Sequence, residues 1–146
     1  MSNTAPGSPK SLSVTVVGLI TPLLGVAYGI FGASVLSSGV AIANRPDEEG
    51  CRTFLVLWGA TGVVLGVIFL LHGVAIVFGG LGVLRRKQWG RDLTLFMAAI
   101  TIPWGLVLVG TYDRGTSHVA CGAAQLVYSG LALVILVRNR TEFSGR

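Results

Sequence analysis

The chain has 146 residues, of which 52% are hydrophobic and only 12% are charged. Soluble domains carry about 25% charged residues because their surfaces face water. The mean hydropathy of +0.75 therefore excludes an ordinary water-soluble globular domain and favours a protein that lives in lipid.

The charged residues are segregated along the chain and leave four uncharged stretches. Each stretch reaches or exceeds the roughly 20 residues that a helix needs to cross a bilayer. None alternates polar and apolar residues as a membrane β-strand would. We therefore predict an all-α fold, a four-helix antiparallel transmembrane bundle in a single domain over residues 12–137. The expected spans are residues 13–42, 54–84, 93–112 and 119–137.

The small, polar, proline-containing residues 1–11 predict a disordered cytoplasmic arm. Ala41-Ile42-Ala43 has the form of a signal-peptide cleavage site, but the preceding apolar stretch is about twice the usual length. We therefore expect it to stay as the first span. Pro22 is expected to bend this span, because proline removes one ladder hydrogen bond.

The sequence Arg-Arg-Lys-Gln-Trp-Gly-Arg-Asp at residues 85–92 predicts a tight hairpin between the second and third spans. Gly90 permits the reversal and Asp92 can cap the next helix. A topology-fixing turn and a docking hairpin for a cytoplasmic partner both remain open. The residues expected to lie among lipid head groups are Arg85, Arg86, Lys87, Trp89 and Arg91.

Apolar helix, R-R-x-x-W-G-R, apolar helix over residues 73–100 resembles the hairpin of small uncharacterised four-span prokaryotic membrane proteins. The resemblance implies a multi-pass protein of the bacterial inner membrane. It implies no activity.

Basic residues favour the cytoplasmic side of short loops. If the N-terminus, the 85–92 loop and a basic cytoplasmic tail at residues 138–146 share one side, that side carries eight of the 11 basic residues. This predicts an N-in, C-in orientation. The pI of about 9.9 then reflects charges that flank helix ends, so we expect the lipid bilayer, and not nucleic acid, as the partner.

Glycine supplies 21 residues, about twice its usual 7% share. Small residues let helices approach closely in lipid, where hiding leucine gains nothing. Two G-x-x-x-G pairs occur, Gly25/Gly29 and Gly62/Gly66. They could lock the first two helices together within one chain, or they could build a homo-oligomer or a larger membrane complex.

Four polar or aromatic side chains are expected deep in the spans: His72, Gln125, Tyr128 and Trp104. At 1.5 Å per residue, His72 lies roughly 18 Å from the cytoplasmic end of its helix, near the midplane. Such residues either hydrogen-bond across helices or form a proton-relay or ligand pocket.

No metal-ligand spacing or nucleophile-base pair is present in the sequence. Haem held by two histidines is disfavoured, because His118, the only other histidine, falls at the outer surface. We therefore expect no cofactor, no metal and no enzymatic activity. Cys51 and Cys121 both fall on the oxidising, extracytoplasmic side, where they form a disulfide or remain two small buried thiols.

These observations favour a non-enzymatic accessory or scaffold subunit that packs through glycine-rich helix faces. The alternative is a small oligomeric transporter or channel with a polar midplane site around His72.

Overall fold

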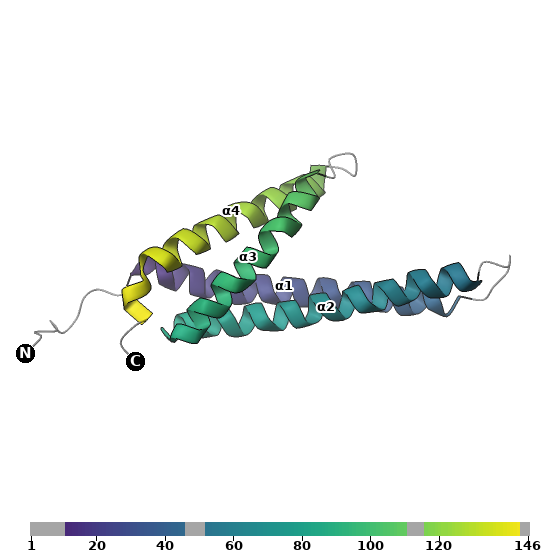
Figure 1. Ribbon diagram of the computed structural model, residues 1–146, viewed down its shortest axis with the longest axis horizontal. Coiled ribbons are helices and arrows are strands. Elements are labelled where there is room, and N and C mark those ends of the chain that lie inside the picture. Colours follow the sequence, from purple (N-terminus) through teal and green to yellow (C-terminus); the bar gives the residue numbers. More distant parts are fainter. Residues whose placement is uncertain (1–10, 46–51, 111–115, 144–146) are drawn as a thin grey trace, which may run out of the picture. The chain divides into compact units, whose positions relative to one another are not determined.

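The computed structural model describes residues 11–45, 52–110 and 116–143, without the side chains of Leu108 and residues 116–118. These ranges hold four α-helices, α1 (Leu12–Ala43), α2 (Arg52–Leu84), α3 (Gln88–Gly110) and α4 (Thr116–Arg138), and a 3₁₀ helix, η2 (Arg140–Phe143) (Figure 1). They contain no strand, which confirms the all-α prediction. Three helical segments are long and apolar enough to cross a membrane, namely α1, α2 and Val119–Arg138 of α4.

The chain divides into two compact units, and both α1 and α2 pass from one to the other. The first unit contains residues 1–21 and 78–146, and the second contains residues 22–77. The boundary in α1 falls at Pro22, which lies inside a continuous helix. The expected bend at Pro22 stays a prediction.

In the second unit, α1 and α2 are joined by glycines that recur every seven residues. Gly25, Gly32 and Gly39 on α1 and Gly59, Gly66 and Gly73 on α2 are all buried. We call these six residues the glycine seam. A seven-residue repeat keeps one face of a helix turned towards its partner. The same spacing continues into the first unit at Gly18 and Gly80, which are also buried.

The two helices touch through their backbones along the seam. A Cβ added to Gly32 would lie 2.7 Å from the Leu70 nitrogen, and one added to Gly39 would lie 2.6 Å from the Val63 nitrogen. A Cβ on Gly73 would lie 2.6 Å from the Gly25 oxygen. Side chains larger than hydrogen therefore do not fit, which is why glycine occupies these positions.

The two predicted G-x-x-x-G pairs are placed differently from one another. Gly25 and Gly66 belong to the seam, and Gly62 borders it, since a Cβ there would lie 2.9 Å from the Gly39 Cα. A Cβ on Gly29 would meet nothing within 4 Å. The contact pattern therefore follows the seven-residue spacing more closely than the four-residue spacing.

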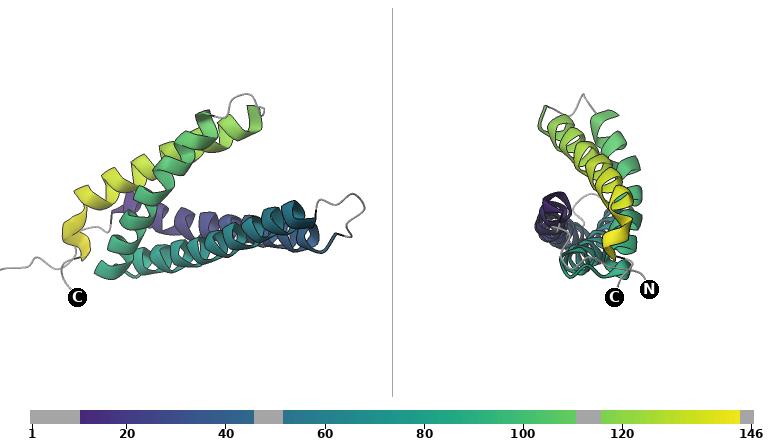
Figure 2. Two further views of the ribbon diagram at one scale, coloured as in Figure 1. Left: turned by 45° about the vertical axis from the view of Figure 1, so that its right-hand side comes forward. Right: turned by 90° about the vertical axis from the view of Figure 1, so that its left-hand side faces the viewer.

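In the first unit, α3 packs against α4 (Figure 2). Its apolar core draws on the start of α1, the end of α2, the end of α4 and η2. The fully or nearly fully buried members are Val14, Val17, Val83, Ala132, Leu136 and Phe143. Chain segments far apart in the sequence therefore meet at this end of the unit.

The reversal between α2 and α3 differs from its predicted form. The Lys87 nitrogen donates to the Gly82 oxygen and the Arg86 nitrogen to the Val83 oxygen, both at 2.9 Å. This is a Schellman motif, in which the residue after the helix adopts the left-handed conformation, and here that residue is Arg86, with φ of 54°. Gly90 lies inside α3, where a Cβ on Gly82 would come 2.5 Å from its Cα.

Asp92 also lies inside α3, which begins at Gln88, so the expectation that Asp92 caps this helix was wrong. The charged residues of the hairpin show where the polar part of the sequence ends, but α3 begins about one turn earlier, at Gln88.

The seam predicts a contrast between two alanine substitutions on α1. Gly32→Ala should destabilise the protein by about 1–3 kcal/mol because the new methyl overpacks against the α2 backbone. Gly29→Ala should be neutral or stabilising, since alanine is the better helix former and its methyl meets open space. Thermal unfolding of both variants in detergent micelles checks this, and equal shifts of the two midpoints would contradict the seam.

Candidate functional site at the basic end of the first unit

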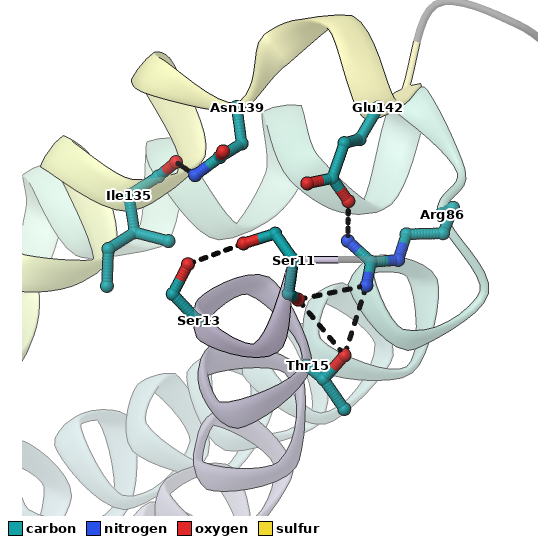
Figure 3. A network of polar contacts seen from close by, with 7 residues as sticks. All are labelled: Ser11, Ser13, Thr15, Arg86, Ile135, Asn139 and Glu142. Carbon is teal, nitrogen blue, oxygen red and sulfur yellow. Dashed lines mark hydrogen bonds and ion pairs between the residues drawn. The ribbon is translucent and has the colours of Figure 1, made fainter. Parts of the chain in front are cut away.

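Arg86 is the centre of a polar network that ties three segments together. Its Nη1 forms an ion pair with Glu142 of η2. Its Nη2 donates to the Ser11 carbonyl oxygen at 3.3 Å and to the Thr15 Oγ1 at 3.0 Å. Figure 3 shows the guanidinium lying between the start of α1 and the C-terminal turn. We call Arg86, Glu142, Ser11 and Thr15 the Arg86 clasp.

The left-handed backbone conformation of Arg86 is energetically unfavourable, and the contacts of its side chain offset this cost. It is the one non-glycine residue with positive φ in the described ranges, and the left-handed conformation costs about 1–2 kcal/mol for a residue with a Cβ. Its side chain is 14% exposed and that of Glu142 is 24% exposed. An ion pair with this little water around it is stronger than a surface pair, so the interaction can hold the strained backbone in place.

The C-terminal turn η2 is folded back onto the unit. Phe143 is 1% exposed within the apolar core, and the Arg91 guanidinium carbon lies 5.9 Å from its ring centroid. Asn139 donates to the Ile135 oxygen at the end of α4 through both its backbone nitrogen, at 3.1 Å, and its Nδ2, at 2.8 Å (Figure 3). Part of the expected basic tail, residues 138–146, is thus ordered structure.

Among the described residues of this end, four cations lie at the surface without an ion-pair partner. Arg86 is paired with Glu142, and Arg91 lies 2.7 Å from the Asp92 carboxylate. The remaining basic side chains, Arg85, Lys87, Arg138 and Arg140, are all exposed and enter no ion pair within the described part of the chain. We call these four residues the basic face.

Four hydroxyl side chains in the first unit form two hydrogen-bonded pairs, whereas the buried Thr94 hydroxyl has no partner within the described residues. Thr21 donates to the Val17 oxygen at 2.6 Å and is also bonded to the Tyr128 hydroxyl. Because a threonine hydroxyl carries one hydrogen, Tyr128 must be the donor to Thr21. By the same reasoning Ser129 donates to Thr101 at 3.0 Å, since Thr101 donates to the Ala98 oxygen.

The predicted deep polar residues fall in different units. His72 lies in the second unit, where its ring meets Tyr28 edge-on at a centroid distance of 5.3 Å. Tyr128, Gln125 and Trp104 lie in the first unit. There Gln125 is half-buried, its Cγ 3.4 Å from where a Gly105 Cβ would be, and Trp104 is 38% exposed. A joint midplane site of these residues stays a prediction.

One of the two cysteines, Cys121, lies within the described residues. Cys121 is exposed on α4, whereas Cys51 lies outside the described residues, and so does the His118 side chain. Across residues 11–45, 52–110 and 119–143, no group of three or more His, Cys, Asp or Glu could hold a metal ion.

Comparison of the chain with protein-family models, with curated proteins and with solved structures finds no match.

The sequence reasoning placed Arg86 among lipid head groups and did not single out its clasp partners Glu142, Ser11 and Thr15. Glu142 is the only acidic residue after Asp113, and a single acid in a basic tail was the signal that an internal ion pair could have been expected. Its partner Arg86 lies 56 positions away, so no local sequence pattern indicates which residue Glu142 pairs with.

The clasp predicts an order of stabilities among three variants. Arg86→Gln should cost about 2 kcal/mol because it leaves the Glu142 carboxylate without its charged partner. Arg86→Gly should cost less by about 1 kcal/mol, since glycine adopts the left-handed conformation without strain. Adding Glu142→Gln to Arg86→Gln should cost little more, because the pair is already broken. Chemical unfolding in micelles of these variants and of Glu142→Gln alone completes the double-mutant cycle, and additive losses would argue against a coupled pair.

Proposed function

We propose that the chain is a four-span membrane protein whose two ends and 85–92 hairpin face the cytoplasm. Besides the three segments already named, α3 has an uncharged run at Leu93–Gly110. At 1.5 Å per residue this run is about 27 Å long, close to the thickness of the hydrocarbon core. The start of α1, the end of α2 and the end of α4 meet in one core, which supports an even number of crossings between them.

Site-specific labelling tests this topology in a Cys51→Ser/Cys121→Ser background. Gln88 and Asn44 are both exposed and lie at opposite ends of the proposed spans. In intact spheroplasts, a membrane-impermeant maleimide should label Asn44→Cys and should label Gln88→Cys only after lysis. Labelling of Gln88→Cys in intact spheroplasts would contradict the proposed orientation.

We infer that the protein acts as a non-enzymatic accessory subunit that binds a transmembrane helix of a partner protein. The single observation that carries this proposal is a groove beside the glycine seam in the second unit. It is open, measures about 360 Å³, and is lined by Ser34, Val35, Ser38, Gly39, Ile42, Trp58, Thr61, Gly62 and Leu65. The seam itself is filled by the contact of α1 with α2, so a further helix needs another surface.

Small residues give the groove the character of a helix-packing surface. Ser34 and Ser38 are spaced by four residues on α1, and Thr61 and Gly62 face them from α2. Ser34 and Thr61 donate their hydroxyl hydrogens to carbonyls of their own helices at 3.0 and 2.9 Å. A helix can therefore approach Ser34 and Thr61 closely without leaving their hydroxyl hydrogens unpaired, and small residues permit such close approach in lipid.

A photo-crosslinking amino acid at Ser38 tests this proposal in native membranes. It should yield a crosslinked product containing another membrane protein, identified by mass spectrometry. The matched control is Val64, which is 58% exposed on α2 of the same unit and does not line the groove. It should yield lipid adducts alone.

Three outcomes at Ser38 would overturn the accessory role. A product identical to that from Val64 would mean that the groove is not selective. A dimer of the chain itself would assign the groove to self-association, and lipid adducts alone would make the groove part of the lipid boundary.

A further inference from the structure

We propose that the basic face of the first unit is a binding surface for anionic phospholipid head groups, and that the Arg86 clasp assembles it. The inference rests on the proposed membrane topology, which the labelling experiment tests separately.

Internal pairing determines which cations are available to a ligand. The two acidic residues described at this end already form ion pairs, Asp92 with Arg91 and Glu142 with Arg86. The sequence alone predicts that Arg86 and Arg91 lie among lipid head groups. In the structure their guanidinium groups also pair with the carboxylates of Glu142 and Asp92. Among the described residues of this end, the cations without an ion-pair partner are those of the basic face: Arg85 and Lys87 in the α2–α3 turn, Arg138 at the end of α4 and Arg140 at the start of η2.

The clasp brings these two pairs of cations to one end. Arg85 and Lys87 flank Arg86, whereas Arg140 begins the short turn that ends with Glu142 and Phe143. The ion pair of Arg86 with Glu142 therefore fixes segments that lie more than 50 positions apart. Burial of Phe143 in the apolar core holds the same turn from the other side.

The surroundings of the basic face match the boundary between head groups and acyl chains. Trp89 is 51% exposed, and its ring edge would lie 3.0 Å from a Cβ on Gly82. Indole rings prefer this depth because one end is apolar and the other polar. The adjacent helix ends expose Leu81, Val134 and Val137 by 39%, 64% and 58%.

This combination favours a lipid over an acidic segment of a protein. A phosphodiester of the surrounding leaflet reaches the cations from the side, while its acyl chains cover the exposed apolar side chains of α2 and α4. Basic clusters at the cytoplasmic ends of spans bind anionic lipids in this way. An acidic protein segment would satisfy the charges but would leave the apolar side chains to other lipids.

Competition between two phospholipids tests the proposal on the full-length protein. The protein is purified in mild detergent, exposed to equal amounts of dioleoylphosphatidylglycerol and dioleoylphosphatidylcholine, and its retained lipids are counted by native mass spectrometry. The wild-type protein should retain several-fold more phosphatidylglycerol. The excess should fall at high salt, because salt screens exposed charges.

Two charge-matched variants locate the surface. Arg138→Gln/Arg140→Gln should abolish most of the phosphatidylglycerol preference. Arg45→Gln/Arg52→Gln removes the same charge from exposed residues of the second unit and should leave the preference unchanged. Equal losses in both variants, or no preference in the wild-type protein, would overturn the proposal. In the latter case an acidic protein segment becomes the better candidate occupant.

Phe143→Ala tests whether the clasp end assembles the surface, because it alters no charge. It should lower the phosphatidylglycerol preference while the protein stays folded, as judged by its thermal midpoint with phosphatidylcholine alone. If it unfolds the protein, Thr15→Val serves instead, because it removes an acceptor of the Arg86 guanidinium and leaves every charge in place. A preference that survives both changes would show that net charge suffices, and would overturn the assembled site.

Discussion

Backbone contact between α1 and α2 is the constraint on which the second unit depends. Glycines at seven-residue intervals let the helices approach until only hydrogen fits between them. In lipid this close approach replaces the hydrophobic driving force that a soluble helix pair would use. Because the seam is filled within the chain, any partner must bind elsewhere, and the adjoining groove lined by Ser34, Ser38 and Thr61 is where small residues remain accessible.

The first unit is held by a different device, a partly buried ion pair at the end where three chain segments meet. Arg86 accepts a left-handed backbone and gains Glu142, Ser11 and Thr15 as partners. Because Glu142 and Asp92 pair with Arg86 and Arg91, the cations of the basic face have no ion-pair partner among the described residues. The same contact that stabilises the unit therefore leaves cations available to bind lipid. The hydroxyl of Thr21 bonds to that of Tyr128, and the hydroxyl of Thr101 to that of Ser129, as expected of helix-packing contacts.

The segregation of charge was enough to predict four helices, and the ends of α1 and α2 agree with the expected spans within two residues. The start of α3 was missed because Arg91 and Asp92 mark the edge of polarity, whereas the helix begins earlier at Gln88. Four-residue glycine spacing pointed to the right helices but to only two seam residues, Gly25 and Gly66. The other four, Gly32, Gly39, Gly59 and Gly73, follow a seven-residue spacing. The clasp joins residues distant in sequence, and only the folded arrangement reveals it.

The seam is tested most directly by solid-state NMR of the protein in lipid vesicles with glycine labelled at Cα. No substitution is needed, so the measurement does not disturb the contact that it probes. The backbone contact predicts through-space cross-peaks between glycines on different helices, in particular Gly39 with Gly62 and Gly29 with Gly73. If the spectra contain only cross-peaks between glycines of the same helix, α1 and α2 do not meet through this seam.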